Sequence, residues 1–285
     1  MEDVIEIKGL NKSYDKFTLK DININLKKGS ITGLIGENGA GKTTTIKAIL
    51  NVIQKDSGNI KIFGLDYIES EKQIKEQIGV VLDDSFLSEY LSPVDINKIM
   101  KNFYQQWDEK LFFSYIEEFK LPKEKIAKEY SSGMKMKLKI ATALSHHPKL
   151  LILDEPTSGL DPIARNEILD IFQDFIQDEE NSILVSSHIT SDLEHIADYI
   201  IFMTEGQIAF QKSRDELLEE YGIVRCGEQE FKQIDSKDFI KYKKNRYEYD
   251  VLVENKKEFK KKYTISIIDK PTIEDIMLIY IKGEK

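Results

Sequence analysis

The sequence predicts an α/β fold built around a sheet of parallel strands. Three short segments, residues 31–35, 150–153 and 182–185, are almost entirely apolar, as strands buried on both faces are. A glycine-rich loop leads from the first segment into a helical pattern over residues 43–53, and another helix is expected over residues 162–177. Because parallel strands need such crossover helices, this order of elements favours an α/β domain.

Antiparallel pairs are expected before and after these segments. Within residues 4–26, apolar side chains alternate with polar ones near both ends, which is the period-two pattern of a sheet with one wetted face. Residues 199–202 and 207–210 are apolar and flank a turn at Gly206, which predicts a closing hairpin.

The chain turns helical between the first two apolar segments, over about residues 86–147. Ser92 places a capping residue ahead of Pro93 at the first position of a helix, and a second helix is expected over residues 108–119. We therefore expect a helical subdomain inside a domain that spans residues 1–212.

Residues 213–285 differ in composition and are richer in Lys, Tyr and Glu. Alternation over residues 247–254 predicts a strand, and Thr272 with Asp275 resembles a capping arrangement before a last short helix. This stretch is interpreted as a small accessory α/β element. Its lysine runs could bind anionic lipid headgroups or a partner subunit, but we favour the interpretation that they are solvent-exposed faces of strands and loops. The element could also dimerise or regulate turnover, and the sequence does not decide between these roles.

Composition excludes several classes of protein. The 41 Lys and Arg residues against 50 Asp and Glu residues give a net charge of -9, which argues against a nucleic-acid-binding surface over the whole protein. The single cysteine, Cys226, excludes an intrachain disulfide and fits a reducing compartment. The chain has no apolar run of the roughly 18 to 20 residues that a membrane-spanning helix needs, and its start is acidic, unlike a secretory signal. We expect a cytosolic protein that another chain holds at any membrane it touches.

The glycine-rich loop reads G-x-x-x-x-G-K-T, the pattern that cradles phosphates in nucleotide triphosphatases. Backbone N–H groups of such a loop converge on phosphate oxygens, and the helix that starts there adds the positive end of its dipole. Lys42 would reach the β- and γ-phosphates, and the hydroxyl of Thr43 would ligate Mg²⁺. The nucleotide-binding candidates here are Gly36, Glu37, Asn38, Gly39, Ala40, Gly41, Lys42, Thr43 and Thr44.

Three further polar residues follow the other two buried segments. Asp154 and Glu155 come at the end of one and His188 follows the other, so all should lie at the edge of the sheet where ligands gather. Asp154 suits Mg²⁺ held through water, and Glu155 suits a general base. Alone, a strand-end Asp-Glu pair is most often a solvated turn, but the phosphate loop upstream reverses those odds. A lone histidine is more often a structural hydrogen-bond donor than a catalytic group, although the position of His188 would let it contact a γ-phosphate. The other histidines, His146, His147 and His195, are expected to be structural or at the surface.

Together these motifs resemble the ATP-binding subunit of an ABC transporter, over nearly the whole chain to about Lys212. The resemblance implies that Tyr14 stacks on adenine, that Asp154 and Glu155 are the magnesium-side and catalytic acids, and that His188 is the switch histidine. Residues 158–161 match the loop that crosses the dimer interface. Ser131 and Gly133, in Tyr130-Ser131-Ser132-Gly133-Met134, stand in the signature motif and would meet the γ-phosphate bound by a partner.

The resemblance also implies an architecture, cofactors and partners. The fold would be the ABC-type core of the P-loop NTPases, a mixed sheet with helices and a helical subdomain, followed by the C-terminal extension. ATP and Mg²⁺ would be the cofactors. Two such subunits, identical or homologous, would pair head to tail and power separate membrane-spanning permease subunits from the cytoplasmic face of the membrane, with no nucleic acid involved.

Two positions depart from the family pattern. The usual signature Leu-Ser-Gly-Gly-Gln is altered at its first, third and last positions, and Asp83 stands where a glutamine contacts Mg²⁺ and the attacking water. A carboxylate can still ligate a hard cation, so Asp83 is a candidate metal ligand, with a loop-capping role equally open. Both departures resemble the exporters of peptide antibiotics and cytolytic peptides, which include the bacitracin-resistance, phenol-soluble-modulin and GntR-regulator-linked types.

Coupling to a permease is expected near Asp83, through the apolar residues Leu82, Phe86, Leu87 and Tyr90, although these could equally be core of the helical subdomain. Two other functions stay open. One is a soluble ABC-type ATPase that acts on ribosomes or DNA, and the other is a regulator that binds ATP without turnover.

Overall fold

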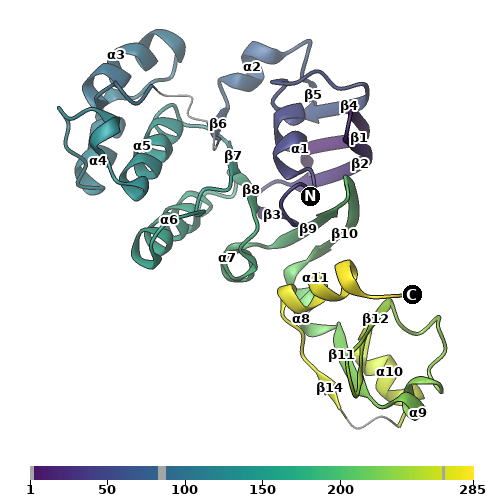
Figure 1. The fold of residues 1–285 in the computed structure, drawn as a ribbon. Coiled ribbons are helices and arrows are strands. Elements are labelled where there is room, and N and C mark those ends of the chain that lie inside the picture. Colours follow the sequence, from purple (N-terminus) through teal and green to yellow (C-terminus); the bar gives the residue numbers. More distant parts are fainter. Residues whose placement is uncertain (1–2, 83–87, 265–266) are drawn as a thin grey trace.

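The computed structural model describes residues 3–82, 88–264 and 267–285 (Figure 1). At its centre is a six-stranded sheet in the order β10-β9-β3-β8-β7-β6. Its strands are β3 (Ile31–Ile35), β6 (Ile78–Val81), β7 (Leu150–Asp154), β8 (Ser182–Ser187), β9 (Tyr199–Thr204) and β10 (Gln207–Ser213). Neighbouring strands from β9 to β6 run parallel, and β10 pairs antiparallel with β9. The predicted buried strands and the closing hairpin are therefore confirmed.

A second sheet, in the order β2-β1-β4-β5, covers one side of this core. It contains β1 (Asp3–Tyr14), β2 (Phe17–Lys27), β4 (Ser57–Ile62) and β5 (Leu65–Asp66), with β1 and β2 forming the predicted antiparallel pair. Helix α1 (Lys42–Ile49) shares one hydrophobic cluster with both sheets, through residues such as Ile46, Ile5 and Ile152. The short α2 (Glu71–Lys75) precedes β6.

Helix α1 is shorter than its sequence pattern predicts. It ends at Ile49 and not near residue 53, because Asn51 adopts the left-handed conformation, with φ of 52°. The backbone N–H of Val52 then donates to the carbonyl of Lys47, which closes the helix as such C-terminal turns do.

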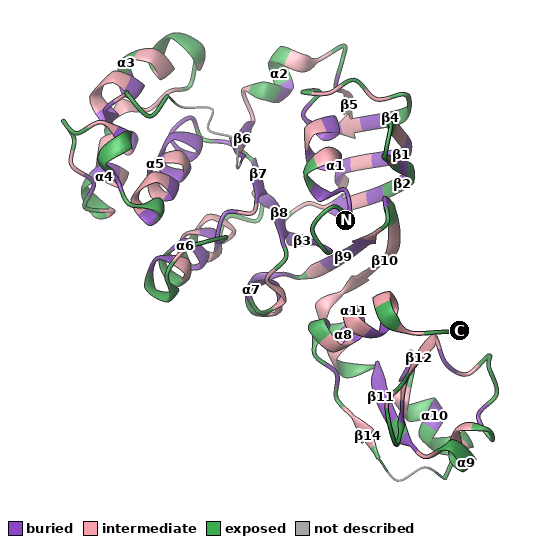
Figure 2. Ribbon diagram, in the orientation of Figure 1, coloured by how far each residue is buried: buried purple, intermediate pink, exposed green. Residues whose placement is uncertain are grey.

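The opposite face of the central sheet carries α6 (Pro162–Phe175) and α7 (Thr190–Ile196). The fully buried side chains Ile168, Phe172 and Leu193 pack there in a common cluster with sheet residues. Figure 2 shows the central strands as almost entirely buried, whereas the outer turns of α6 are exposed. The carboxyl ends of β7 and β8 are thus held by rigid packing on both faces of the sheet.

The helical subdomain comprises α3 (Pro93–Phe103), α4 (Glu109–Glu118), a 3₁₀ turn (Ala127–Glu129) and α5 (Ser132–Leu144). Ser92 and Asp95 form a capping box at the start of α3, and the Asp108 side chain accepts from the backbone of Leu111 at the start of α4. Both predicted helix starts are confirmed. A core of its own, which includes Ile96 and Phe112, holds the subdomain together.

The C-terminal element is a four-stranded antiparallel sheet with flanking helices. The sheet order is β12-β13-β11-β14, and the predicted strand and the capped last helix are confirmed as β13 and α11. The elements are α8 (Arg214–Glu219), β11 (Gly222–Cys226), α9 (Glu228–Phe231), β12 (Lys241–Lys244), β13 (Tyr249–Val253), α10 (Lys256–Lys262), β14 (Ile268–Asp269) and α11 (Ile273–Lys282). Helix α11 returns to the central sheet, where Ile273 and Ile276 share a cluster with Phe202 and Phe210. The element is therefore packed onto the core and is not a loose appendage.

Within the described residues, none of the helices combines the length and the apolar character that crossing a bilayer requires.

The thiol of Cys226 is expected to be unreactive in the folded chain. The side chain is 4% exposed on β11, and burial, with the nearby Glu230 and Asp250 carboxylates, raises its pKa to about 11. With this pKa little thiolate is present at pH 8 in the folded chain, and the thiolate is the reactive form. Unfolding exposes the thiol and lowers its pKa, so the reaction becomes faster. Ellman's reagent at pH 8 should label the denatured chain rapidly and the native chain at least about tenfold more slowly; equal rates would contradict the buried position.

Candidate functional site

The phosphate-loop sequence joins the fully buried strand β3 to α1. Gly36 must be glycine, because an added Cβ would lie 2.3 Å from the carbonyl oxygen of Met203. Gly41, just before α1, has φ of 111°, and an added Cβ there would lie 2.7 Å from a methyl carbon of Leu19. Between them, Glu37, Asn38 and Gly39 are exposed, so the loop offers its tip to solvent and hence to a ligand.

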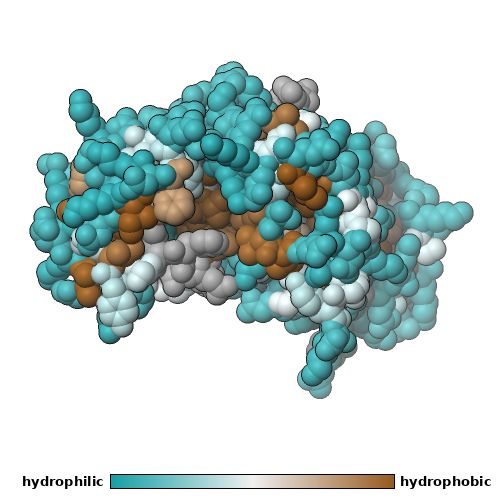
Figure 3. Space-filling model, turned by 90° about the horizontal axis from the view of Figure 1, so that it is seen from above, coloured by the Kyte–Doolittle hydropathy of each residue, from teal (hydrophilic) through white to brown (hydrophobic). Residues whose placement is uncertain are grey.

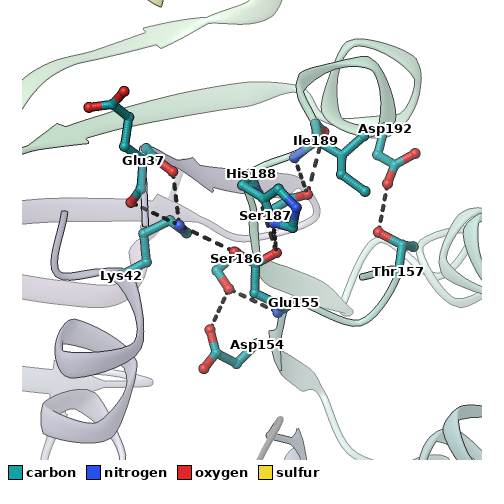
Figure 4. A network of polar contacts seen from close by, with 11 residues as sticks. Glu37, Lys42, Asp154, Glu155, Thr157, Ser186, Ser187, His188, Ile189 and Asp192 are labelled. Atoms are coloured by element: carbon teal, nitrogen blue, oxygen red, sulfur yellow. Dashed lines mark hydrogen bonds and ion pairs between the residues drawn. The ribbon is translucent and has the colours of Figure 1, made fainter. Parts of the chain in front are cut away.

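Lys42 lies inside this loop, although it is charged. Its side chain is only 5% exposed, and Nζ donates to the carbonyl oxygens of Gly36, at 2.9 Å, and Glu37, at 3.4 Å. A carboxylate oxygen of Glu155 lies 3.2 Å from the same nitrogen (Figure 4). An ammonium group held among oxygen acceptors is an arrangement that phosphate oxygens can also satisfy.

The two acidic residues at the end of β7 are held differently. Asp154 is 1% exposed, and its carboxylate accepts from the hydroxyl of Ser186 on β8, at 2.5 Å. That hydroxyl oxygen also accepts from the backbone N–H of Glu155, at 3.0 Å. Glu155 itself has φ of 51°, a left-handed conformation that costs on the order of 1 kcal/mol and turns its side chain away from the line of the strand.

His188 completes the group around Glu155. Its Nδ1 lies 2.6 Å from Oε2 of Glu155, and its backbone N–H donates to the same oxygen at 3.3 Å (Figure 4). The carboxylate of Glu155 thus joins Lys42 on one side to His188 on the other, while the His188 side chain stays 41% exposed. An ammonium, a carboxylate and an imidazole from three separate segments thus lie together at one edge of the sheet.

The residues of the signature motif do not join this group. Ser131 is exposed at the N-terminus of α5, where its hydroxyl accepts from the backbone N–H of Met134 at 3.3 Å. Gly133 is buried, and an added Cβ would lie 2.9 Å from the Cβ of Ala164 on α6. Figure 1 shows α5 in the helical subdomain, well apart from α1. Within one chain the two parts therefore lie apart.

The remaining predicted contacts lie around the loop or outside the described residues. Tyr14 ends β1 and is 48% exposed, with Nζ of Lys12 5.3 Å from its ring centre. Thr43 is exposed in the first turn of α1 and Thr44 is half-buried. Asp83 lies outside the described residues.

The other histidines are structural or at the surface, as expected. Burial lowers the pKa of His146 to about 4, so this ring is neutral at pH 7, stacked on Tyr104 with 3.9 Å between ring centres. His147 is exposed and lies 3.4 Å from the carboxylate of Asp108, and His195 is exposed on α7.

Two supporting residues were missed by the sequence reasoning. Ser186 bridges the two acids as described above, and Asp192, 3% exposed on α7, accepts from the hydroxyl of Thr157 at 2.6 Å. Asp192 also pairs with Arg165 of α6. The sequence spacing could have revealed Asp192, because it follows His188 by four residues, about one helical turn. Among the described residues, no cluster of three or more His, Cys, Asp or Glu side chains could hold a metal ion alone.

An apolar cleft of about 980 Å³ lies between the core and the helical subdomain. Its walls come from the end of α1, from α2 and β6, and from α3 and α5. Figure 3 shows this face with apolar side chains gathered in a hollow. Val52, 52% exposed, and Phe103, 74% exposed, are large apolar side chains left open to solvent there.

The apolar residues predicted to couple to a partner lie only partly in this cleft. Leu82 lines it but is 3% exposed, and Tyr90 is 68% exposed without being one of the lining residues. Phe86 and Leu87 lie outside the described residues. The large exposed apolar side chains of the cleft, Val52 just after α1 and Phe103 at the end of α3, have no motif that marks them in the sequence.

Comparison with known proteins decides the family. The family model described as ABC transporter matches residues 19–158. The lantibiotic transport ATP-binding protein SrtF of Streptococcus pyogenes is 39% identical over 215 residues, which cover 74% of this chain and 92% of that protein. The chain belongs to the ABC transporter ATP-binding proteins. It is an ABC-type ATPase, and its nucleotide is ATP.

Other relatives agree with this assignment. The bacitracin transport ATP-binding protein BcrA of Bacillus licheniformis is 36% identical to this ABC ATPase, over 73% of the chain and 69% of that protein. A solved structure described as the ATP binding subunit of an ABC transporter superposes with a TM-score of 0.67 at 27% identity, covering 75% of this chain and 91% of the other. The resemblance to the peptide-antibiotic branch and the ABC-type fold are both confirmed.

Proposed function

We propose that this ABC ATPase works as a head-to-tail dimer, in which ATP lies between the phosphate loop of one copy and Ser131 and Gly133 of the other. The support is geometric: the loop and the N-terminus of α5 lie apart in one chain, and the loop tip and Ser131 are both exposed. The 13-residue helix α5 directs its N-terminus outward at Ser131, a place where a helix favours an anion. A second copy, or a homologous subunit, supplies what one chain lacks.

In this proposal Glu155 takes a proton from the water that attacks the γ-phosphate, and His188 holds that carboxylate in place. Lys42 has its ammonium 3.2 Å from Glu155 and binds the β- and γ-phosphates when ATP enters. Tyr14, exposed at the end of β1, stacks on the adenine.

Mg²⁺ fits the oxygen donors present at this edge of the sheet. This ion takes few protein ligands and leaves other positions to phosphate and water, which agrees with a site that has no three-residue metal cluster among the described residues. Thr43 would ligate it directly, Asp154 through water, and Asp83 would replace the glutamine of the family. When bound, the ion neutralises charge on the transferred phosphate.

The apolar cleft is the observation that carries the link to transport. Large exposed apolar surfaces on soluble domains mark sites of association, and a groove walled by helices suits an amphipathic helix laid into it. We infer that a cytoplasmic helix of a permease subunit occupies the cleft, so that the ATPase lies on the inner face of the cell membrane. Because relatives are named for lantibiotic and bacitracin transport, the cargo we propose is an antimicrobial or cytolytic peptide moving outward.

Replacing Phe103 with Glu is expected to uncouple the ATPase from its permease. A carboxylate at this position of the apolar cleft would be desolvated when the permease helix docks, so co-purification with the permease should fall at least about tenfold. Cells that carry the transporter should also lose protection against the exported peptide, with bacitracin and a lantibiotic as the probes. Tyr247→Glu changes another highly exposed aromatic, which lies outside the cleft, and serves as the control. Unchanged co-purification for Phe103→Glu would show that the permease does not dock in the cleft.

A further inference from the structure

The short helix α7 lies between the hydrolysis site and the C-terminal element (Figure 1). It begins at Thr190, directly after His188 and Ile189, and ends at Ile196. A helix of this length is unstable by itself in water. Contacts on its two sides must therefore hold it, and with it the backbone of His188, in position.

On the side of the site, Asp192 anchors α7. Its buried carboxylate accepts from the hydroxyl of Thr157 and pairs with Arg165 of α6 (Figure 4 shows the first contact). Thr157 follows Glu155 closely in the chain, after Pro156. A buried carboxylate with both partners in place resists displacement, because moving it would leave charge unpaired. Helix α7 is thus tied to the segment that carries Glu155.

On the opposite side, α11 of the C-terminal element anchors the same helix. An oxygen of the Glu194 carboxylate accepts from the backbone N–H of Ile273, the first residue of α11. That N–H has no partner within α11, and a carboxylate is favoured at a helix N-terminus. Leu193 of α7 shares its hydrophobic cluster with Ile273 and Ile276. Arg214, which opens α8, adds a hydrogen bond to the carbonyl oxygen of Glu194, at 3.4 Å.

We propose that Glu194 is a positioning residue through which the C-terminal element sets the place of His188 beside Glu155, and so the rate of ATP hydrolysis. A movement of α11 shifts α7, and α7 begins two residues after His188, whose imidazole lies 2.6 Å from the Glu155 carboxylate. This inference rests on the catalytic roles proposed above for Glu155 and His188. It gives the C-terminal element a function, control of turnover within the same chain.

The test compares single variants of the full chain. Glu194→Ala should lower kcat for ATP about tenfold, because small displacements of reacting groups cost up to a hundredfold, while the KM for ATP stays the same. Glu194→Gln keeps an oxygen that can accept from Ile273 and should recover most of the rate. Asp238→Ala, which removes an ion pair with Lys262 inside the C-terminal element, is the matched control and should keep its kcat.

Single-turnover rates in a His188→Ala background separate positioning from general destabilisation. If Glu194 acts through His188, Glu194→Ala has no further effect there; an equal fall in both backgrounds, or an unchanged kcat in the single variant, would overturn the inference. If His188→Ala alone hydrolyses ATP like the parent chain, the proposed role of His188 fails, and this inference with it. If His188→Ala loses hydrolysis activity while Glu194→Ala keeps the full kcat, the positioning role of Glu194 is wrong but the proposed role of His188 stands.

Discussion

Glu155→Gln is expected to bind ATP as tightly as the parent chain and to hydrolyse it about a thousandfold more slowly, the usual contribution of a general base. The amide keeps the size of the carboxylate and can still accept from His188, but it cannot take a proton from water. Lys42 and the phosphate loop are untouched, so nucleotide affinity should persist. Asp170→Asn, which neutralises an exposed carboxylate on α6, should keep its hydrolysis rate and provides the control.

The same variant should accumulate as a dimer when ATP and Mg²⁺ are present. Without hydrolysis the nucleotide stays between the loop of one copy and Ser131 of the other, and binding to the dimer shifts the association equilibrium by mass action. Light scattering should give twice the monomer mass with saturating Mg-ATP and the monomer mass without it. A monomer under both conditions would contradict the shared site.

Lys42→Ala is expected to weaken ATP binding by about a hundredfold, in line with the loss of one buried charge-assisted contact. The ammonium of Lys42 is the cation that the structure holds inside the phosphate loop, 2.9 Å from the Gly36 carbonyl oxygen. Its removal takes away the phosphate partner and leaves Glu155, with a side chain 15% exposed, without this cation. Equilibrium titration with a fluorescent ATP analogue measures the change.

A lysine outside the site distinguishes this effect from a general change in charge. Lys110 is exposed on α4, and Lys110→Ala should bind ATP like the parent chain. A loss of ATP affinity of less than about threefold for Lys42→Ala would be smaller than the contribution of one hydrogen bond to a charged group. Such a result would mean that the ammonium does not contact the phosphates.

Local patterns were enough to predict the phosphate loop and the acids that follow β7. A glycine-rich loop after a buried strand constrains the backbone within a few residues. The carboxyl ends of parallel strands lie at the same edge of a sheet, however long the chain between the strands is. The group of Lys42, Glu155 and His188 was therefore predictable as a set. Its internal arrangement was not, because the left-handed backbone of Glu155, with φ of 51°, decides which atoms meet.

Contacts between distant segments account for most of what the sequence left open. In the C-terminal element at least one strand was predicted but β12 was not located, since it consists of Lys241–Lys244 and lacks an apolar face. The docking of α11 depends on Phe202 and Phe210 of the central sheet. The apolar residues of α11 repeat as in any amphipathic helix, and such a pattern does not say which surface will cover them.

The position of the C-terminal element bears on its lysine runs. Helix α10, with Lys260, Lys261 and Lys262 in its last turn, lies at the end of the molecule opposite the apolar cleft (Figure 1). If the permease helix docks in the cleft, the bilayer lies on that side, and headgroup attraction fades within about a Debye length of 10 Å. The exposed Lys260 and Lys261 would then lie far from the bilayer, where acidic cytosolic proteins can reach them and phospholipids cannot.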